Sequence, residues 1–472
     1  MKLLKSLRKA QVSALALVGA ATLATSFDAN AIPPFARQTG FKCVACHVGG
    51  MFPQLTSLGR MFKLTGYTLG NRPNLGDMVV NEDYPPVAIM IQGAKQFYGN
   101  NKAQQFGNSP SSAFDDQVVS LFAGGKITDN VGAFLQFTAQ KYGNTQTGSQ
   151  WTNAPAQDNS EVRYADRKVG ANSDLIYGVY VNNRPTMSDV WNTTENWASG
   201  WINFFNGGNA QAPVTFLDQD TMQHLALGTG AYVFKDKTWY GEVGAYKSVT
   251  HGVLSFATAG NSAGAYGAAN LIDTSPYFRF AYNKEWGPHS FEVGLHGMIA
   301  YAHSPLALGG NTDWSGAINT YRDIAIDSQY QYVLDPHYFA AHFRLSHENS
   351  YYSSSNFLFT PGAGAPLNNQ LTETYLDGTY IYQAKYGAML TYQGATGNAN
   401  SGLYAMSGTF SPNWQSVTPH IFYQPWQNVR IGYMYQIYTQ MGGASQGLTF
   451  NGIANLKPAD FNTSMLYVGM IY

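Results

Sequence analysis

Charged residues are scarce in this chain of 472 residues. Asp, Glu, Lys and Arg make up only 12% of it and the formal net charge is −1, whereas they make up about 25% of an average globular chain. A balance this close to neutral provides no basic surface for nucleic acid, so that class of partner is excluded. The chain also lacks any apolar run of the roughly 18 residues that a membrane-spanning helix needs.

Cysteine is nearly absent as well, and its two occurrences, Cys43 and Cys46, are followed directly by His47. A zinc site would need two further ligands nearby, and neither Cys nor His occurs between His47 and His224. A redox dithiol normally opens a helix within a βαβ unit, which is not evident here. The C-x-x-C-H spacing instead indicates one covalently attached haem c, with both thiols bonded to the haem vinyl groups and His47 as the iron ligand.

The N-terminus fits the export that haem attachment requires. Four basic residues precede residue 10, an apolar run covers residues 10–24, and Ala29-Asn30-Ala31 has the small-x-small form of a cleavage site. We expect residues 1–31 to be a removable signal peptide.

Aromatic residues and glycine are abundant: aromatics reach 14%, with 32 tyrosines and 49 glycines. Apolar residues recur with period two in residues 131–140, 291–301 and 339–345, which is typical of strands with one apolar face. A soluble β-sandwich or β-helix also alternates, but low charge and long loops on alternate connections favour a membrane barrel. The predicted fold is all-β, a transmembrane antiparallel β-barrel of about 16 strands with a small N-terminal monohaem cytochrome c segment.

The strands are expected to be joined by short turns at one end and long loops at the other. Turn residues occur at 129–130, 236–237, 287–288, 335–336 and 427–428, and stretches rich in Gly, Asn and Ser fall near 100–115, 143–159, 184–220, 250–273, 304–319, 351–370, 397–414 and 441–461. Strands are predicted to start near 87, 117, 131, 160, 174, 222, 238, 275, 289, 321, 337, 371, 386, 415, 429 and 462. An even count places both barrel ends on the periplasmic side, and the long loops then face outward. The last strand ends on the aromatic Tyr472, as outer-membrane assembly signals do.

Three regions follow from these patterns: the signal peptide at 1–31, a monohaem segment at 32–86 and the barrel at 87–472. The haem segment is too short for a core of its own, so we expect it to lean on the barrel. Its apolar residues are expected to pack on the haem; they are Phe35, Phe41, Phe52, Phe62 and Leu64.

The haem segment resembles a known family. Phe35-Ala-Arg-Gln-Thr-Gly40, the haem motif, Phe52-Pro53-x-Leu55-Thr56 and Gly59-Arg60-x-Phe62-Lys63-Leu64-x-Gly66-Tyr67-Thr68 are similar to the fused monohaem cytochrome-porins of iron-oxidising bacteria. The resemblance covers the haem segment closely and the barrel by architecture. It implies an outer-membrane Fe(II)-oxidising oxidoreductase that takes electrons from extracellular Fe(II) and passes them to a periplasmic cytochrome c or copper protein.

Carried over to this chain, the resemblance assigns Cys43 and Cys46 to haem attachment and His47 to iron. Arg37 and Arg60 are predicted to face the haem propionates, because guanidinium suits bidentate contact with carboxylate; the alternative is that they solvate the segment or face an acidic lumen. The sixth iron ligand stays open, and the candidates are Met51, Met61, Met78, His296 and Met298.

Two other functions remain open at this point. The chain is alternatively a diffusion porin or transporter with a haem-bearing plug or sensor, or an electron conduit whose donor or acceptor is not iron. Inward-facing carboxylates of Glu292, Asp323 and Asp327 are predicted to attract Fe(II), a cation suited to oxygen ligands. In every case the expected location is the bacterial outer membrane, with the haem segment at the periplasmic side or within the lumen.

Overall fold

The computed structural model describes most of the barrel and the core of the haem segment. The described residues are 34–50, 52, 54–70, 86–98, 116–142, 150–151, 156–193, 214–217, 226–249, 270–271, 273–303, 306–308, 311–313, 318–352, 366–404, 407–450 and 452–472. The predicted signal peptide and residues 71–85 of the predicted haem segment lie outside them. Within these ranges, no helix has both the length and the apolar character that crossing a membrane demands.

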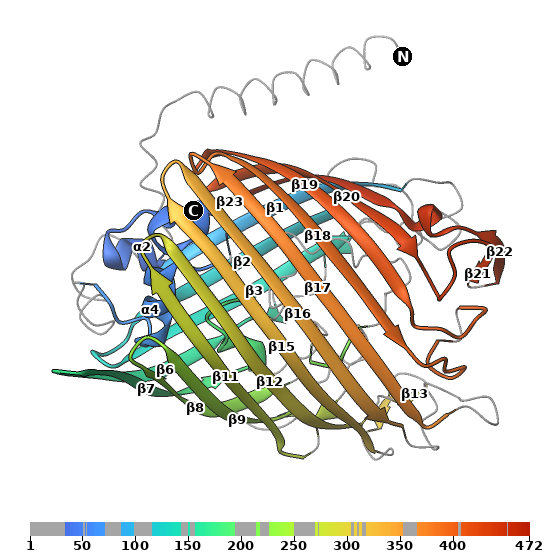
Figure 1. Ribbon diagram of the computed structural model, residues 1–472, viewed down its shortest axis with the longest axis horizontal. Coiled ribbons are helices and arrows are strands. Elements are labelled where there is room, and N and C mark those ends of the chain that lie inside the picture. The colour runs from blue at the N-terminus through green and yellow to red at the C-terminus, as the bar shows by residue number, and fades with distance from the viewer. Residues whose placement is uncertain are drawn as a thin grey trace, which may run out of the picture.

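Sixteen long antiparallel strands form a closed barrel (Figure 1). Each strand pairs with the next one, and β1 pairs with β23, which closes the ring from Met90↔Ile471 to Tyr98↔Thr463. The strands are β1 (Val87–Tyr98), β2 (Asp116–Lys126), β3 (Val131–Tyr142), β6 (Glu161–Gly170), β7 (Ser173–Asn182), β8 (Leu227–Lys235), β9 (Trp239–Lys247), β11 (Ser275–Trp286), β12 (His289–His303), β15 (Ile318–Leu334), β16 (His337–Tyr351), β17 (Asn368–Tyr382), β18 (Tyr386–Gly397), β19 (Trp414–Trp426), β20 (Val429–Gln440) and β23 (Thr463–Ile471).

The predicted strands are confirmed. The observed starts lie within a few residues of the predicted ones, and the largest difference is β8, which begins at Leu227 and not near 222. Three short strands extend the barrel sheet: β4 (Gln150–Trp151) and β5 (Ala156–Gln157) pair with β3, and β10 (Asn270–Leu271) pairs with β12. The other short elements lie outside that sheet: β13 (Leu306–Leu308), β14 (Asn311–Asp313), β21 (Leu448–Phe450), β22 (Ile453–Leu456), η3 (Pro185–Met187) and η7 (Pro458–Phe461).

The outer surface of the barrel is apolar and the inner surface is polar. On β12, Val293 and Ile299 are exposed outward, whereas Glu292 and His296 are fully buried on the inward face. Period-two alternation produces this separation because successive side chains of a strand point to opposite faces. Outward apolar residues such as Ile326, Leu376 and Ile421 continue the band around the barrel; these side chains are 51%, 48% and 62% exposed.

A ring of exposed aromatic residues lies near the short-turn end of this band. Its members are Trp239, Trp286, Tyr380, Tyr382, Tyr386, Tyr423, Trp426 and Tyr472. An apolar exterior with an aromatic girdle at the membrane interface is the surface of an outer-membrane barrel. The chain is therefore a porin-like barrel of the bacterial outer membrane.

The predicted short turns all join neighbouring strands at one end of the barrel. At 236–237 both Asp236 and Lys237 have positive φ, the conformation that suits the twist of a two-residue hairpin. The C-terminus lies at the same end (Figure 1), which is the periplasmic end of such barrels.

The long connection after β7 departs from the expectation that the long loops face outward. Its described parts, residues 183–193 and 214–217, lie inside the lumen, where Val190, Trp191 and Phe216 are buried. Three consecutive backbone N–H groups hold it there: Thr215 donates to Glu373 at 3.3 Å, Phe216 to Glu348 at 2.6 Å and Leu217 to Asp323 at 2.6 Å. The carboxylates come from the inner faces of β17, β16 and β15, so the polar barrel wall supplies the acceptors that draw this loop inward.

The N-terminal segment forms short helices that lie at the short-turn end of the barrel (Figure 1). They are α2 (Pro34–Thr39), α3 (Cys43–Cys46), η1 (Val48–Gly50) and α4 (Ser57–Leu64). We call residues 34–70 the plug, since the contacts described below place them against the inner face of the barrel.

Candidate functional site

The Cys-x-x-Cys-His motif forms a single helical turn followed by extended chain. The His47 N–H donates to Cys43 O at 2.8 Å, and the Cys46 carbonyl accepts from Thr56 N at 2.9 Å. A short bridge between His47 and Leu55 then returns the chain alongside the motif. This turn brings both thiols and the imidazole close together, as the spacing predicts.

The helix α4 packs directly on the end of α3. Thr56 caps α4, because its hydroxyl accepts from Gly59 N at 3.3 Å, and the same hydroxyl donates to Ala45 O at 2.6 Å. A Cβ atom at Gly59 would stand 2.2 Å from Cys46 O, which is far inside contact distance. Glycine at 59 is therefore what lets α4 approach the motif.

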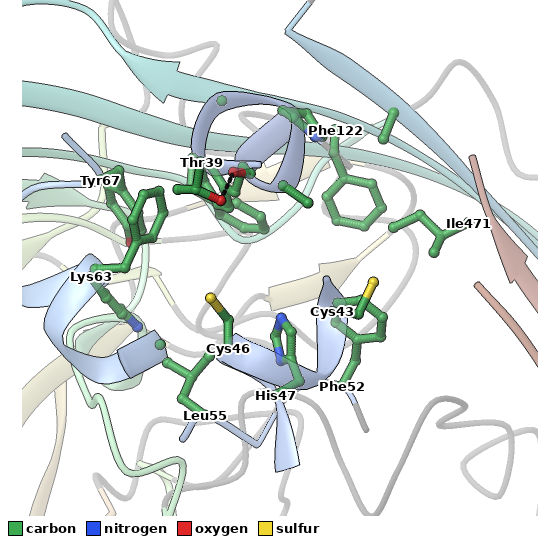
Figure 2. A pocket seen from close by; sticks show the side chains of 18 of the residues that line it. Thr39, Cys43, Cys46, His47, Phe52, Leu55, Lys63, Tyr67, Phe122 and Ile471 are labelled. Carbon is green, nitrogen blue, oxygen red and sulfur yellow. Dashed lines mark hydrogen bonds between the residues drawn. The ribbon is translucent and has the colours of Figure 1, made fainter. Parts of the chain in front are cut away.

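Both thiols and the imidazole line one cavity between the plug and the barrel wall (Figure 2). The cavity holds about 1410 Å³ of space between its walls, its open mouth included. Its walls are largely apolar and aromatic. They include Phe35, Phe41, Phe52, Leu55, Phe62 and Tyr67 from the plug, and Ala88, Met90, Phe122, Phe134 and Ile471 from β1, β2, β3 and β23.

These residues fit a haem c. The two thiols point into an aromatic cavity with the following histidine beside them, as Figure 2 shows, and flat apolar walls suit a porphyrin face. Of the five apolar plug residues expected on the haem, Phe35, Phe41, Phe52 and Phe62 line the cavity. Leu64 does not, because it is buried in another cluster that contains Trp191 and Tyr232.

The surroundings of the thiols argue against an activated redox dithiol. Burial raises the pKa of the Cys43 thiol, and it raises the pKa of Cys46 to about 11. Redox-active cysteines have lowered pKa values instead, since the thiolate is their reactive form. Among the described residues, no three His, Cys, Asp or Glu side chains gather in a metal-binding group.

The plug is fixed to the inner face of the barrel by polar contacts. Arg60 is 3% exposed and donates to Glu285 at 3.0 Å, Ser290 at 2.6 Å and Gln331 at 2.9 Å. The Tyr67 hydroxyl donates to Glu161 on β6 at 2.8 Å. The expectation that the N-terminal segment leans on the barrel is confirmed, because it packs on inward-facing residues of the wall at the short-turn end (Figure 1).

Neither arginine predicted at the propionates lines the cavity. Arg37 donates to Val87 O at 2.7 Å at the rim, and Arg60 is engaged with the acidic and amide groups of the wall, as in the alternative raised for it. Their propionate role stays a prediction. The cations that line the cavity are Lys42, which is exposed, and Lys63, which is buried.

None of the described candidates for the sixth iron ligand lines the cavity that contains the thiols. Met51 and Met78 lie outside the described residues. Met61 lines a different cavity, between α4 and Trp191, so it faces away from the thiols. His296 and Met298 point into the lumen from β12, but neither lines the thiol cavity, and His296 Nδ1 is 3.2 Å from Arg279. None of these three side chains borders the thiols, and the sixth iron ligand stays open.

Two methionines that the sequence reasoning missed do line the cavity. Met90 alternates inward on β1 with exposed Ile89 and Ile91 on either side, so the period-two pattern was the signal that could have found it. Met187 comes from the loop after β7, and no local pattern in the sequence predicts that this loop enters the lumen.

The lumen carboxylates face inward as predicted, but they already have partners. Arg279 lies 3.0 Å from Glu292 and 2.6 Å from Asp327, and Asp323 accepts from Leu217 N. Their charge is used to hold Arg279 and the loop. These contacts engage one oxygen of each carboxylate, and the attraction of Fe(II) by these residues stays a prediction.

Comparisons with known proteins add little to this geometry. No family model matches the chain, and no curated protein matches it. Among solved structures, it is similar to OmpT, an outer membrane protein of Vibrio cholerae, with 10% identity, a TM-score of 0.42, and coverage of 82% of this chain and 96% of that one. The outer membrane channel DcaP of Acinetobacter baumannii has 12% identity, a TM-score of 0.42 and coverage of 82% and 96%. An anion-selective porin from Comamonas acidovorans has 11% identity, a TM-score of 0.42 and coverage of 82% and 99%.

Proposed function

We propose that this protein is an outer-membrane c-type cytochrome that receives electrons from extracellular Fe(II) and passes them to a periplasmic carrier. The observation that carries the proposal is the cavity itself. Both thiols and the imidazole of the haem motif line one aromatic cavity, held inside the barrel at its periplasmic end. An electron cannot cross the apolar band of the barrel through lipid, so a redox centre inside the lumen gives it a route.

Each residue of the site has a defined part in this function. Cys43 and Cys46 attach the haem, His47 holds its iron, and the phenylalanines that line the cavity keep water from it. When bound, the haem supplies one-electron chemistry. Phe41 and Lys42 are exposed at the mouth of the cavity, which supports transfer to a periplasmic cytochrome c or copper protein docking at that end.

The choice of Fe(II) as donor rests on the resemblance of the plug sequence to the iron-oxidising cytochrome-porins. Stopped-flow mixing of the haem-bearing protein with Fe(II) at its working pH tests it directly. We expect the absorption bands of ferrous haem to appear as Fe(II) is consumed. An oxidised haem that stays oxidised in excess Fe(II) would rule out iron as the donor.

A second candidate function is a porin or transporter whose haem-bearing plug serves as a gate or sensor. The closed sixteen-strand, porin-like barrel supports it. Planar-bilayer conductance of the haem-bearing protein, compared with a Cys43→Ser/Cys46→Ser double variant, separates the two. A large conductance in both would favour transport, and a negligible one in the haem-bearing form would favour electron transfer.

The haem midpoint potential distinguishes inward transfer from Fe(II) from two other cases: a conduit with a different donor, and one that carries electrons outward. Redox titration of the haem places its midpoint potential relative to Fe(II) and to periplasmic carriers. A haem potential well above that of the periplasmic carriers would make inward transfer to them uphill and would rule out that direction.

A further inference from the structure

Lys63 is an unusual residue within the plug. Its side chain is only 9% exposed and lines the thiol cavity, on the same side as Cys46 (Figure 2). Charged lysines are almost never buried to this extent unless they are paired with an opposite charge. The partners of this ammonium therefore need to be accounted for.

The protein itself supplies two carbonyl partners to the ammonium. Lys63 Nζ donates to Met187 O and, at 3.2 Å, to Asp189 O. An ammonium group has three N–H donors, so one remains for the cavity. Within the described residues, no Asp or Glu oxygen forms an ion pair with Lys63.

Glu161 and Asp189 are acidic residues whose charge acts on Lys63, but their carboxylates contact other groups. Glu161 lies 2.9 Å from Arg163 and accepts from the Tyr67 hydroxyl. Asp189 accepts from Trp191 N at 2.9 Å and lies 3.6 Å from Arg279. Burial lowers the pKa of Lys63 to about 8, although Glu161 and Asp189 oppose this shift. The protein alone thus compensates the buried charge incompletely.

We propose that Lys63 binds a haem propionate within this cavity. A haem carries two propionate carboxylates, and a buried carboxylate needs a cation or hydrogen-bond donors to offset its desolvation. Lys63 is the buried cation of the cavity, with a donor left over, whereas Arg37 and Arg60 lie outside the lining. The inference rests on the proposed function, because it requires a haem to be present.

The same contact joins the plug to the loop after β7. Lys63 holds the carbonyls of Met187 and Asp189 while it contacts the cavity. A propionate bound to its third N–H would therefore tie the haem to a loop that lies deeper in the lumen. The residue acts through position and charge, not as an iron ligand.

Two variants and a matched control test the proposal in the full-length, haem-bearing protein. Lys63→Met removes the charge and keeps the chain length, Lys63→Arg keeps the charge, and Lys42→Met removes the exposed cation of the same cavity. Resonance Raman spectra report the propionate bending bands, and redox titration reports the midpoint potential. We expect Lys63→Met to shift the propionate bands and lower the potential, because loss of a nearby positive charge favours Fe(III).

In Lys63→Arg the propionate bands and the midpoint potential should stay close to those of the wild type. In Lys42→Met both should change by less than half of the change seen in Lys63→Met. Unchanged bands in Lys63→Met, or a larger effect from Lys42→Met, would overturn the inference and leave the proposed function standing. A wild-type protein without the α-band of a c-type haem would overturn the proposed function and this inference with it.

If Lys63→Met does not assemble, carbodiimide coupling of the wild-type protein gives the answer. The reagent activates the propionate carboxyl, the Lys63 amine then forms an amide with it, and the urea leaves. Peptide mass spectrometry should find the haem peptide joined to the peptide that contains Lys63. Coupling to Lys42 alone, or no coupling, would contradict the proposal.

Discussion

The thiols of Cys43 and Cys46 lie in surroundings that keep them protonated at neutral pH. Burial is the largest cause, and for Cys46 the neighbouring Cys43 adds to it. A protonated thiol is a poor nucleophile, so it does not react readily with oxidants or metals. At the scale of single residues, the site therefore suits cysteines that serve as attachment points.

In the haem-free protein, the protonated state of Cys46 should make its alkylation by iodoacetamide slow. With a pKa of about 11, the thiolate fraction of Cys46 rises about tenfold per pH unit and levels off only near pH 11. At pH 8 we expect modification roughly 10²-fold slower than in the urea-unfolded chain, whose thiols have ordinary pKa values near 8.5. Mass spectrometry of the modified peptide measures both rates. A plateau below pH 8 would show an activated thiolate and favour the redox dithiol.

Met61 provides a second test at the residue scale. It lines the cavity between α4 and Trp191 and not the thiol cavity, so Met61→Leu should leave the ferric haem spectrum and midpoint potential unchanged. The swap conserves volume and should cost less than about 1.5 kcal/mol of stability. Met90→Leu and Met187→Leu are the comparison, since both residues line the thiol cavity. A spectral change in Met61→Leu alone would contradict the geometry.

That Cys43, Cys46 and His47 line one site could be predicted from their spacing alone, whereas the cations around them could not. Arg60 and Lys63 lie three residues apart on α4, and nothing local indicates which of them turns to the cavity. The close contact of Gly59 with Cys46 sets the rotation of α4, and that rotation directs Arg60 to Glu285 and Lys63 to the cavity. Tertiary packing decided this, and a single sequence carries no signal for it.

Among the elements, the contact between α3 and α4 is the tightest constraint on the site. We expect Gly59→Ala to push α4 away from Cys46, at a cost of roughly 1–3 kcal/mol for overpacking. The fraction of purified protein that carries covalent haem should fall, as measured by haem absorbance per protein. Leu58→Ala is the control, because Leu58 is 36% exposed on the same helix. Equal haem content in both variants would show that the contact does not shape the site.

The strands and the loop after β7 differ in how far the sequence predicts them. Strands were predictable because alternation is imposed by the two environments, lipid outside and a polar lumen inside. The path of the loop was not, because it depends on Glu373, Glu348 and Asp323, which lie more than 100 residues further along the chain. Carboxylates on a lumen face look the same in sequence whether they bind a cation or backbone N–H groups.

Removing one of those acceptors should loosen the loop. Glu348→Ala leaves the buried Phe216 N–H without its acceptor, which costs about 1–3 kcal/mol. We expect more frequent and larger current steps in planar bilayers than for the wild type. Ser350→Ala, on the same strand and also buried, should behave like the wild type. Identical traces for Glu348→Ala and the wild type would mean that the loop does not obstruct the lumen.

The whole molecule combines a barrel of porin-like architecture with a lumen that is occupied at two levels. The plug contacts β6, β11, β12 and β15 at the periplasmic end, and the loop after β7 contacts Arg279, Arg344 and Asp323 further in. The two meet where Lys63 binds the carbonyls of Met187 and Asp189. A solute that crosses the lumen therefore meets both, whereas electron transfer requires neither to move.

This arrangement predicts that the intact protein conducts electrons better than ions. Liposomes that carry the protein and enclose oxidised cytochrome c should show cytochrome reduction after external Fe(II) is added, while sugar-driven swelling stays near that of empty liposomes. Cys43→Ser/Cys46→Ser should abolish the reduction, because no haem is attached, and should leave swelling low as long as the plug stays docked. Arg60→Met, which removes the contacts to Glu285, Ser290 and Gln331, should raise swelling several-fold by freeing the plug. Rapid swelling with wild-type protein, at rates typical of an open sixteen-strand channel, would show that the plug and loop do not close the lumen and would favour transport over electron transfer.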